Sequence, residues 1–287
     1  MSNGLEPIRR RVGEVSLHAV EAGPPDGPLA ILLHGFPEFW YGWRRQIGPL
    51  AAASLRVVAP DQRGYNLSDK PQGVESYAIG RLAADVVGLA DALGRERFFL
   101  VGHDWGGMVA WRVAARHPDR VERLAILNAP HPRAFGPYAR HHPGQALRSA
   151  YVGFFQLPFI PEAALRAGGF ALLRQALLRS SRPGAFTPED LARYEAAWRE
   201  PGALTAMLNW YRAIRLRPAR DGDEGRIRCP TLVIWGRRDS ALESGLAEAS
   251  AALCDDARIV WHDNATHWVQ HEEPEAVSAA LAGFLAG

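Results

Sequence analysis

The most informative part of the sequence is Gly102-His103-Asp104-Trp105-Gly106-Gly107. It follows an apolar run, Phe98–Val101, and opens a segment with helical spacing. A side chain at the apex of so tight a strand-to-helix turn needs small residues two positions away on each side, and Gly102 and Gly106 meet that need. The pattern is typical of a nucleophile elbow in which aspartate replaces the usual serine. Asp104 is also a good helix N-cap residue, so a purely structural role stays open at this point.

Short apolar runs on both sides of this turn predict a sheet. Each run is rich in Val, Ile, Leu or Phe and nearly continuous, as in parallel strands that are covered on both faces. The runs are Leu29–Leu33, Leu55–Pro60, Phe98–Val101, Leu124–Leu127, Thr231–Trp235 and Arg258–Trp261. An antiparallel hairpin of Ile8–Val12 and Glu14–Val20, turned by Gly13, is expected at one edge. Helices are expected at Tyr77–Leu93, Trp105–Arg116 and Glu275–Leu285, which predicts an α/β fold.

The stretch from Pro132 to Pro218 has a different character. It contains no convincing β run, is rich in Leu, Ala, Arg and aromatic residues, and is interrupted by prolines. We expect a helical lid over the carboxyl ends of the strands, where α/β proteins bind ligands. The predicted organisation is a core formed by residues 1–131 and 219–287, with the lid at 132–218 inserted between its two parts.

Composition excludes several classes of protein. The chain has 287 residues, of which 47% are hydrophobic and 22% charged, and its formal net charge is +2. No apolar run approaches the ~20 residues of a membrane-spanning helix, and no apolar region of a secretory signal follows the first residues. The two cysteines, Cys229 and Cys254, cannot make a disulfide framework and suit a reducing compartment. We therefore expect a cytoplasmic protein without a nucleic-acid or membrane partner.

Two polar residues complete a catalytic pattern. Asp239 follows the run Thr231–Trp235, and His267 follows Arg258–Trp261, so both are expected at the same rim of the sheet as Asp104. The order nucleophile, acid, histidine is the one that accompanies a nucleophile elbow. A nucleophile needs a base, and the base needs a group that orients it.

A fourth motif, His34-Gly35-Phe36-Pro37, comes directly after the run Leu29–Leu33. Its glycine allows a sharp turn, and Pro37 is a candidate for a cis peptide bond. The backbone amides of Phe36 and Trp105 are then expected to converge as an oxyanion hole.

In these motifs the sequence resembles the epoxide hydrolases of the α/β-hydrolase fold. The matching stretches are HGFPEFW (34–40), DQRGYNLSD (61–69), GHDWGG (102–107), WGRRD (235–239) and THWVQHEEP (266–274). The resemblance extends from about Glu14 to Leu285. It implies a mostly parallel eight-stranded sheet with helices on both faces and a helical lid. It also implies hydrolysis of a small hydrophobic epoxide by water to a diol, through an ester on Asp104. Neither a metal nor an organic cofactor is implied, and the protein is expected to be a monomer or homodimer.

The resemblance also implies that two lid tyrosines, Tyr151 and Tyr211, supply a proton to the epoxide oxygen. They stand in YVGFFQ (151–156) and NWYR (209–212), which are similar to lid motifs of that family. A shared helical face that turns Tyr211 toward the core is formed by Leu204, Met207, Leu208, Tyr211 and Ile214. Aromatic neighbours of the motifs are candidates for substrate binding: Phe39, Trp40, Phe154, Phe155, Trp210 and Trp268.

Haloalkane and haloacetate dehalogenases also use an aspartate nucleophile and stay as alternatives. Haloacetate dehalogenases carry arginines one and four positions after the nucleophile, where this chain has Trp105 and Met108. Haloalkane dehalogenases lack the pair of lid tyrosines, although Trp105 can mimic their halide-binding tryptophan. A non-catalytic binding protein on this fold is a remote alternative, and the complete set of Asp104, His267 and Asp239 argues against it.

Overall fold

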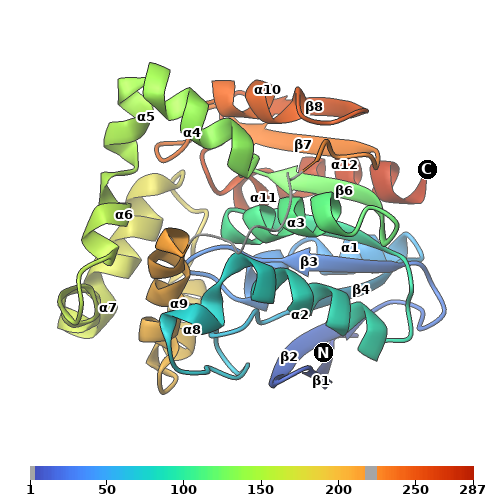
Figure 1. The fold of residues 1–287 in the computed structure, drawn as a ribbon. Helices are drawn as coiled ribbons and strands as arrows, with labels where there is room; N and C mark the ends of the chain where they lie inside the picture. Colours follow the sequence, from blue (N-terminus) through green and yellow to red (C-terminus); the bar gives the residue numbers. More distant parts are fainter. Residues whose placement is uncertain (1–3, 217–224) are drawn as a thin grey trace.

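Residues 4–216 and 225–287 are described by a computed structural model. They form an eight-stranded sheet with the order β1-β2-β4-β3-β5-β6-β7-β8 (Figure 1). The strands are β1 (Glu6–Val12), β2 (Val15–Ala22), β3 (Leu29–Leu33), β4 (Arg56–Pro60), β5 (Phe98–His103), β6 (Val121–Leu127), β7 (Thr231–Gly236) and β8 (Ala257–His262). β2 pairs antiparallel with both β1 and β4, and the other neighbouring strands pair in parallel. The predicted mostly parallel sheet with an edge hairpin is confirmed.

The strands follow the predicted apolar runs closely, with one exception in burial. β3 has the predicted bounds, and all residues of β3, β5 and β7 are buried. β8 is different, because Arg258 is exposed and the rest of the strand is only half-buried. The prediction that β8 is covered on both faces is therefore wrong. This strand ends the sheet order, so it has a neighbour on one side only.

Helices cover both faces of the sheet, as predicted (Figure 1). On one face lie α2 (Ile79–Ala92), α3 (Trp105–Arg116) and α10 (Gly245–Ala251), and on the other lie α1 (Ile47–Ala52), α11 (Val269–Glu272) and α12 (Pro274–Ala286). The pleat of β3 separates the two layers, since Leu29, Ile31 and Leu33 join the first core and Ala30 and Leu32 the second. Within the described ranges, no helix has the length and apolarity to cross a membrane.

The start of α2 differs from the predicted helix, and two short helices precede it. Two 3₁₀ helices, η1 (Trp40–Trp43) and η2 (Val74–Tyr77), precede α2. The predicted helix Tyr77–Leu93 is in fact two elements, because Ala78 has an extended ψ of 138° between them. Gly94 follows with a positive φ of 72°, a conformation that glycine adopts readily and that ends the helix.

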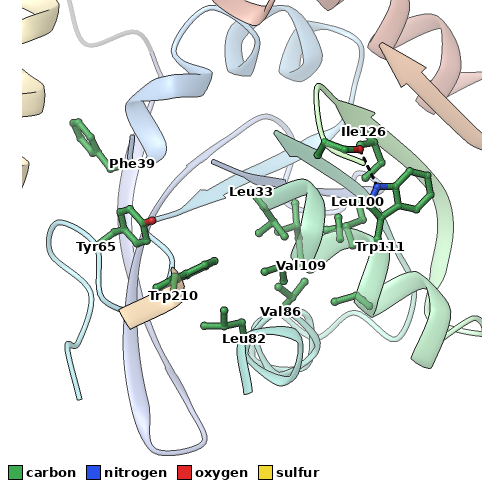
Figure 2. Packing of buried hydrophobic residues seen from close by; sticks show 14 of the residues in the cluster. Leu33, Phe39, Tyr65, Leu82, Val86, Leu100, Val109, Trp111, Ile126 and Trp210 are labelled. Atoms are coloured by element: carbon green, nitrogen blue, oxygen red, sulfur yellow. Dashed lines mark hydrogen bonds between the residues drawn. The ribbon is translucent and has the colours of Figure 1, made fainter. Parts of the chain in front are cut away.

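The larger core continues from the sheet into the lid, as Figure 2 shows. Its sheet side chains face those of α2 and α3, and the group includes Leu33, Leu100, Ile126, Leu82, Val86 and Val109. Trp111 is fully buried there, and its indole N–H donates to the Ala129 carbonyl oxygen at 3.1 Å. Trp210, from the lid, packs edge-on against Tyr65 with ring centroids 5.3 Å apart. Shared apolar packing thus anchors the lid on the core.

The lid connects β6 to β7 along the chain. It lies at one end of the sheet, on the left in Figure 1. Its elements are α4 (Pro132–His141), α5 (Pro143–Arg148), α6 (Ala150–Phe155), α7 (Ile160–Ser180), α8 (Pro188–Arg199), α9 (Ala203–Arg212) and the 3₁₀ helix η3 (Ala213–Arg215). The helical character is as predicted up to residue 216, and the predicted boundary between 218 and 219 lies outside the described residues. Ile214 was wrongly placed on the buried face of α9. The helix ends at Arg212, and Ile214 is 56% exposed on η3.

Candidate active site

Asp104 stands on the sharp turn between β5 and α3. Its φ of 50° and ψ of −121° are unusual for a residue with a side chain and are typical of strained positions at functional sites. The flanking glycines are required by space. A Cβ on Gly102 would lie 2.5 Å from the Gly106 carbonyl oxygen, and one on Gly106 would lie 2.2 Å from the Leu33 carbonyl oxygen. Asp104 occupies the N-cap position of α3 without a side-chain capping bond, so the capping role does not explain its carboxylate.

The Asp104 carboxylate is held on one oxygen and approached by a base on the other. Its Oδ1 accepts a hydrogen bond from the Phe36 amide at 2.8 Å, and its Oδ2 lies 3.5 Å from Nε2 of His267. Burial raises its pKa, but the hydrogen bond and charge of His267 outweigh burial and hold the pKa below its usual range. The carboxylate is thus ionised near neutral pH, while 18% of its side chain remains exposed.

His267 bridges the two carboxylates. Its Nδ1 lies 2.7 Å from Oδ2 of Asp239, and 8% of its side chain is exposed. Burial lowers the His267 pKa, but the charge of Asp239 and the hydrogen bonds to Asp104 and Asp239 raise it well above its usual value. Burial likewise raises the pKa of Asp239, yet the charge of His267 brings it below its usual range. The geometry brings together the three side chains that were predicted to act together.

Asn128, at the end of β6, is part of this arrangement and was not predicted. Its side-chain amide donates to Oδ2 of Asp239 at 2.7 Å, and its Oδ1 accepts from the Gly236 amide at 2.9 Å. Its φ of 39° turns the chain at this point. The backbone amides of Ala241 and Leu242 donate to the other Asp239 oxygen, at 2.7 and 3.0 Å. The sequence signal was a polar residue that follows a predicted strand, similar to the post-strand loops that marked Asp239 and His267.

Of the two backbone amides that are predicted to form an oxyanion hole, the Phe36 amide donates a hydrogen bond to Asp104. The Phe36–Pro37 peptide bond is cis, and the Phe36 amide points at Asp104. A Cβ on Gly35 would lie 2.4 Å from that of Asp104, so glycine lets the two loops approach closely. Trp105 is the first residue of α3, where backbone amides have no acceptor inside the helix.

Both lid tyrosines lie near the predicted nucleophile. The ring centroids of Tyr151 and Tyr211 are 6.0 Å apart, and Tyr211 is 3% exposed. Burial raises the pKa of each phenol, and the negative charge of Asp104 raises both further. Tyr151 as a residue is 42% exposed, and its ring packs edge-on against those of Phe155 and Tyr211. Both phenols are protonated near neutral pH.

Three of the predicted substrate-binding aromatics contact residues around Asp104, namely the lid tyrosines, His267 or Trp105. Phe155 is buried, with its ring centroid 4.9 Å from that of Tyr211 and 5.5 Å from that of Tyr151. Trp268 packs edge-on against His267 at 5.1 Å, and Trp210 packs against Trp105 at 5.7 Å. The aromatic surroundings of Asp104 therefore come from both the lid and the core.

The other three contact different parts of the molecule. Phe39 is buried against Tyr41 and Tyr194, which belong to the contact between lid and core. The rings of Trp40 and Phe39 meet edge-on, while the Trp40 amide donates to Asp61. Phe154 is 37% exposed and packs on Phe155. Proximity to a motif in the sequence did not determine which way these rings point.

A buried polar chain behind His267 was also missed. Glu38, only 1% exposed, accepts hydrogen bonds from Tyr194 at 2.6 Å, His271 at 2.7 Å and Gln270 at 3.1 Å. Its Oε2 lies 3.4 Å from Nδ1 of His103, whose Nε2 is 2.9 Å from the His267 carbonyl oxygen. Glu38 therefore ties the loop after β3 to the backbone of the predicted base. The charged residue inside an apolar motif was the available signal.

Elsewhere the structure has a further cavity, but no metal-ligand cluster among residues 4–216 and 225–287. A cavity of about 320 Å³ lies at the amino ends of β3 and β5, beside Leu29 and Phe98, at the opposite end of the sheet from Asp104. In residues 4–216 and 225–287, no three His, Cys, Asp or Glu side chains are grouped so as to hold a metal ion.

Comparison with known proteins gives consistent matches along the chain. A family model described as the alpha/beta hydrolase fold matches residues 28–274. The AB hydrolase superfamily protein YfhM of Bacillus subtilis is 46% identical over 271 residues, which are 94% of each chain. Epoxide hydrolase A of Mycobacterium tuberculosis is 38% identical and is matched over 95% of each chain. A Bacillus megaterium epoxide hydrolase, solved with its product (R)-3-[1]naphthyloxy-propane-1,2-diol, has a TM-score of 0.88 at 30% identity and covers 98% of this chain, with 100% of that chain matched.

Proposed function

The chain belongs to the epoxide hydrolases of the alpha/beta hydrolase fold, and from this we propose that it hydrolyses an epoxide to a vicinal diol through a covalent ester on Asp104. The observation that carries the proposal is that the two oxygens of the Asp104 carboxylate have different neighbours. The Phe36 amide holds Oδ1 at 2.8 Å, while Oδ2 faces Nε2 of His267 at 3.5 Å. One oxygen is thus fixed and the other is available for attack.

Ring opening is the first step. Oδ2 of Asp104 attacks one ring carbon, the carbon–oxygen bond breaks, and its electron pair goes to the epoxide oxygen. A carboxylate does this without losing a proton, in contrast to a serine hydroxyl. Tyr151 and Tyr211 hydrogen-bond the epoxide oxygen, and one of them transfers its proton to the alkoxide as it forms. General acid assistance of this kind contributes roughly 10²–10⁴-fold to the rate.

Hydrolysis of the ester is the second step. Esterification removes the negative charge of Asp104, which is one cause of the high His267 pKa. The pKa of His267 therefore falls at this stage, and more of the imidazole is in the neutral form that can accept a proton. His267 takes a proton from water, and the hydroxide attacks the carbonyl carbon of Asp104. The amides of Phe36 and Trp105 stabilise the oxyanion. The imidazolium returns its proton to the departing diol oxygen, and the carboxyl proton restores the tyrosine.

The substrate class follows from the side chains around Asp104. Phe155, Trp105 and Tyr211 present aromatic surfaces there. The proposed reaction does not require a charged group on the substrate. We therefore propose a neutral, apolar epoxide, with an aryl epoxide as the first substrate to try. The naphthyloxy diol bound by the Bacillus megaterium enzyme is a product of this type.

The decisive experiment is a single turnover of an aryl epoxide in ¹⁸O-labelled water, followed by mass spectrometry of the diol and of the peptide that contains Asp104. With excess enzyme, the diol is expected to carry unlabelled oxygen and the label to appear on Asp104. Label that enters the diol directly would show that water attacks the ring and would end the covalent proposal. The Asp104→Asn variant is the control without a nucleophile.

The dehalogenase alternatives are separated by product. Haloalkane and haloacetate substrates are incubated with the same preparation, and halide release is measured beside diol formation. Halide release without any diol from epoxides would favour a dehalogenase. Trp105 and Met108, where haloacetate dehalogenases carry arginines, favour the epoxide.

A further inference from the structure

The outer edge of the lid carries large apolar side chains that face solvent. α5 and α6 form this edge together with the link to α7 (Figure 1). Its exposed members, which we call the apolar edge, are Leu147, Phe154, Leu157, Phe159 and Ile160. The exposure of Phe159 reaches 82% and that of Leu147 reaches 78%. Single exposed apolar residues are common, but a group along one edge marks an interaction surface.

Phe159 also has an unusual backbone. Its φ of 62° and ψ of −35° lie outside the regions that a bulky residue prefers. Burial does not compensate for this conformation, because the ring points into solvent. Strained positions persist where the surrounding structure enforces them, and they cluster at functional sites.

The apolar edge is held firmly and lies beside the proposed site. Arg212 donates to the Leu157 carbonyl oxygen at 2.8 Å and forms an ion pair with Glu162 at 2.7 Å. Gln156 donates to the Tyr211 carbonyl oxygen at 2.9 Å. These contacts connect the link between α6 and α7 to α9, which carries one of the two predicted proton donors. Residues 156–162, which include part of the apolar edge, are therefore tied to the helix that carries Tyr211.

The charge of this region is strongly biased. No Asp or Glu occurs between Glu122 and Glu162, a stretch that includes the whole apolar edge. Residues 132–180 contain six arginines and one acidic residue, Glu162, which gives a net charge of +5 against +2 for the full chain. Glu162 is itself buried and paired with Arg212. Arg140 on α4 and Arg166 on α7 are exposed, and Arg148 on α5 is exposed but forms an ion pair with Glu243 at 3.8 Å.

We propose that the apolar edge docks on an anionic lipid surface. Its apolar side chains would enter the interfacial layer, and the surrounding arginines would meet the acidic headgroups. A second copy of the chain is a poorer occupant, since a face-to-face contact would bring two strongly basic surfaces together. The expectation of no membrane partner came from the missing spanning helix, which does not bear on peripheral binding. The inference goes beyond the proposed reaction, and its test measures binding alone.

The test is flotation of the full chain with lipid vesicles. One set is phosphatidylcholine alone, and the other contains about one third phosphatidylglycerol. We expect the protein to float with the anionic vesicles, to remain behind with the neutral ones, and to be released as salt is raised.

Two variants and two matched controls locate the binding surface. Phe159→Ser with Ile160→Ser is expected to weaken binding roughly tenfold or more, because apolar area no longer leaves water. Arg140→Glu is expected to weaken it at least about fivefold. Leu67→Ser, at an exposed leucine outside the lid, and Arg97→Glu, at the amino end of β5, are expected to bind as the parent does. Thermal unfolding confirms that each variant is folded.

Several results would overturn the proposal. These are absence of flotation with anionic vesicles, equal flotation with neutral ones, or equal losses in the variants and the matched controls. A dimer in solution that the double variant Phe159→Ser with Ile160→Ser abolishes, without lipid binding by the parent, would assign the edge to self-association instead.

Discussion

The amide nitrogen of Phe36 lies 2.8 Å from Oδ1 of Asp104, across 68 residues of sequence. The two residues meet because β3 and β5 are parallel neighbours, with Leu33 opposite Gly102, so both loops leave the sheet at the same level. β3 also has β4 on its other side, which makes this the point where the strand order reverses. Ligands of open α/β sheets bind outside the carboxyl ends of the strands at such a point.

This close approach predicts that Gly35→Ala inactivates the enzyme. The new Cβ would lie 2.4 Å from the Asp104 Cβ and would push the amide of Phe36 away from the carboxylate. A displacement of about 1 Å can lower a rate by about 10²-fold. Gly80→Ala, at an open position in α2, is the matched control and is expected to keep full activity. Steady-state kinetics on an aryl epoxide measure both. Normal turnover by Gly35→Ala would show that the contact is dispensable.

His267→Gln should accumulate the ester. Asp104 keeps its nucleophilic oxygen, but water has no base to activate it, so alkylation outruns hydrolysis. Intact-protein mass spectrometry after mixing with an epoxide is expected to show one substrate equivalent bound to Asp104. The doubly changed protein with Asp104→Asn as well provides the control. An adduct that persists in this double variant would place the bond elsewhere.

Removal of either lid phenol should slow ring opening. Tyr151→Phe and Tyr211→Phe are each expected to lower the rate of alkylation by roughly 10²–10⁴-fold, because the alkoxide loses a proton donor. Tyr138→Phe is the matched control, since this lid phenol donates to Glu243 instead. Stopped-flow measurement of the first turnover separates alkylation from hydrolysis. Unchanged alkylation in both site variants would remove the case for epoxides.

Asn128 is expected to matter for the second step. Asn128→Ala removes the amide that fixes Asp239, which costs about 1–3 kcal/mol of stability and misaligns His267. Ester hydrolysis should then slow by up to about 10²-fold, with alkylation much less affected. Asn66→Ala is a close control, because Asn66 has a φ of 40° and donates to Asp61 at 2.8 Å away from the catalytic residues. Equal kinetic losses in both variants would mean a general structural effect.

The pKa of His267 makes stability depend on pH. Its folded pKa is raised well above the usual ~6.5. The stability from its charged form is therefore fully present below about pH 6.5 and is lost as pH rises through the folded pKa. We expect the Tm of the parent to fall on the alkaline side, and His267→Gln to lower the Tm overall but flatten this slope. Differential scanning calorimetry across this range gives both curves, and parallel slopes would contradict the assignment.

Much of the fold and the centre of the site could be predicted because they follow local rules. Continuous apolar runs mark strands that are buried between two helical layers, and the bounds of β3 were predicted residue for residue. Asp104, Asp239 and His267 each stand after one of the predicted strands, and parallel strands bring their carboxyl ends to one edge. The burial of β8 was overestimated, because an apolar run alone does not distinguish an edge strand from a central strand.

Other features depended on packing between distant elements. Asn128 reaches Asp239 because β6 and β7 are neighbours, and Glu38 reaches the backbone of His267 only through His103. Periodicity did not show that Phe155 faces the tyrosines while Phe154 faces solvent. The sheet, the elbow and the three polar residues after the strands follow from the amino-acid sequence alone, because apolar runs and turn residues are local properties. The supporting polar contacts and the aromatic lining could be found only in three dimensions, because side-chain direction there depends on how the lid helices cross the core.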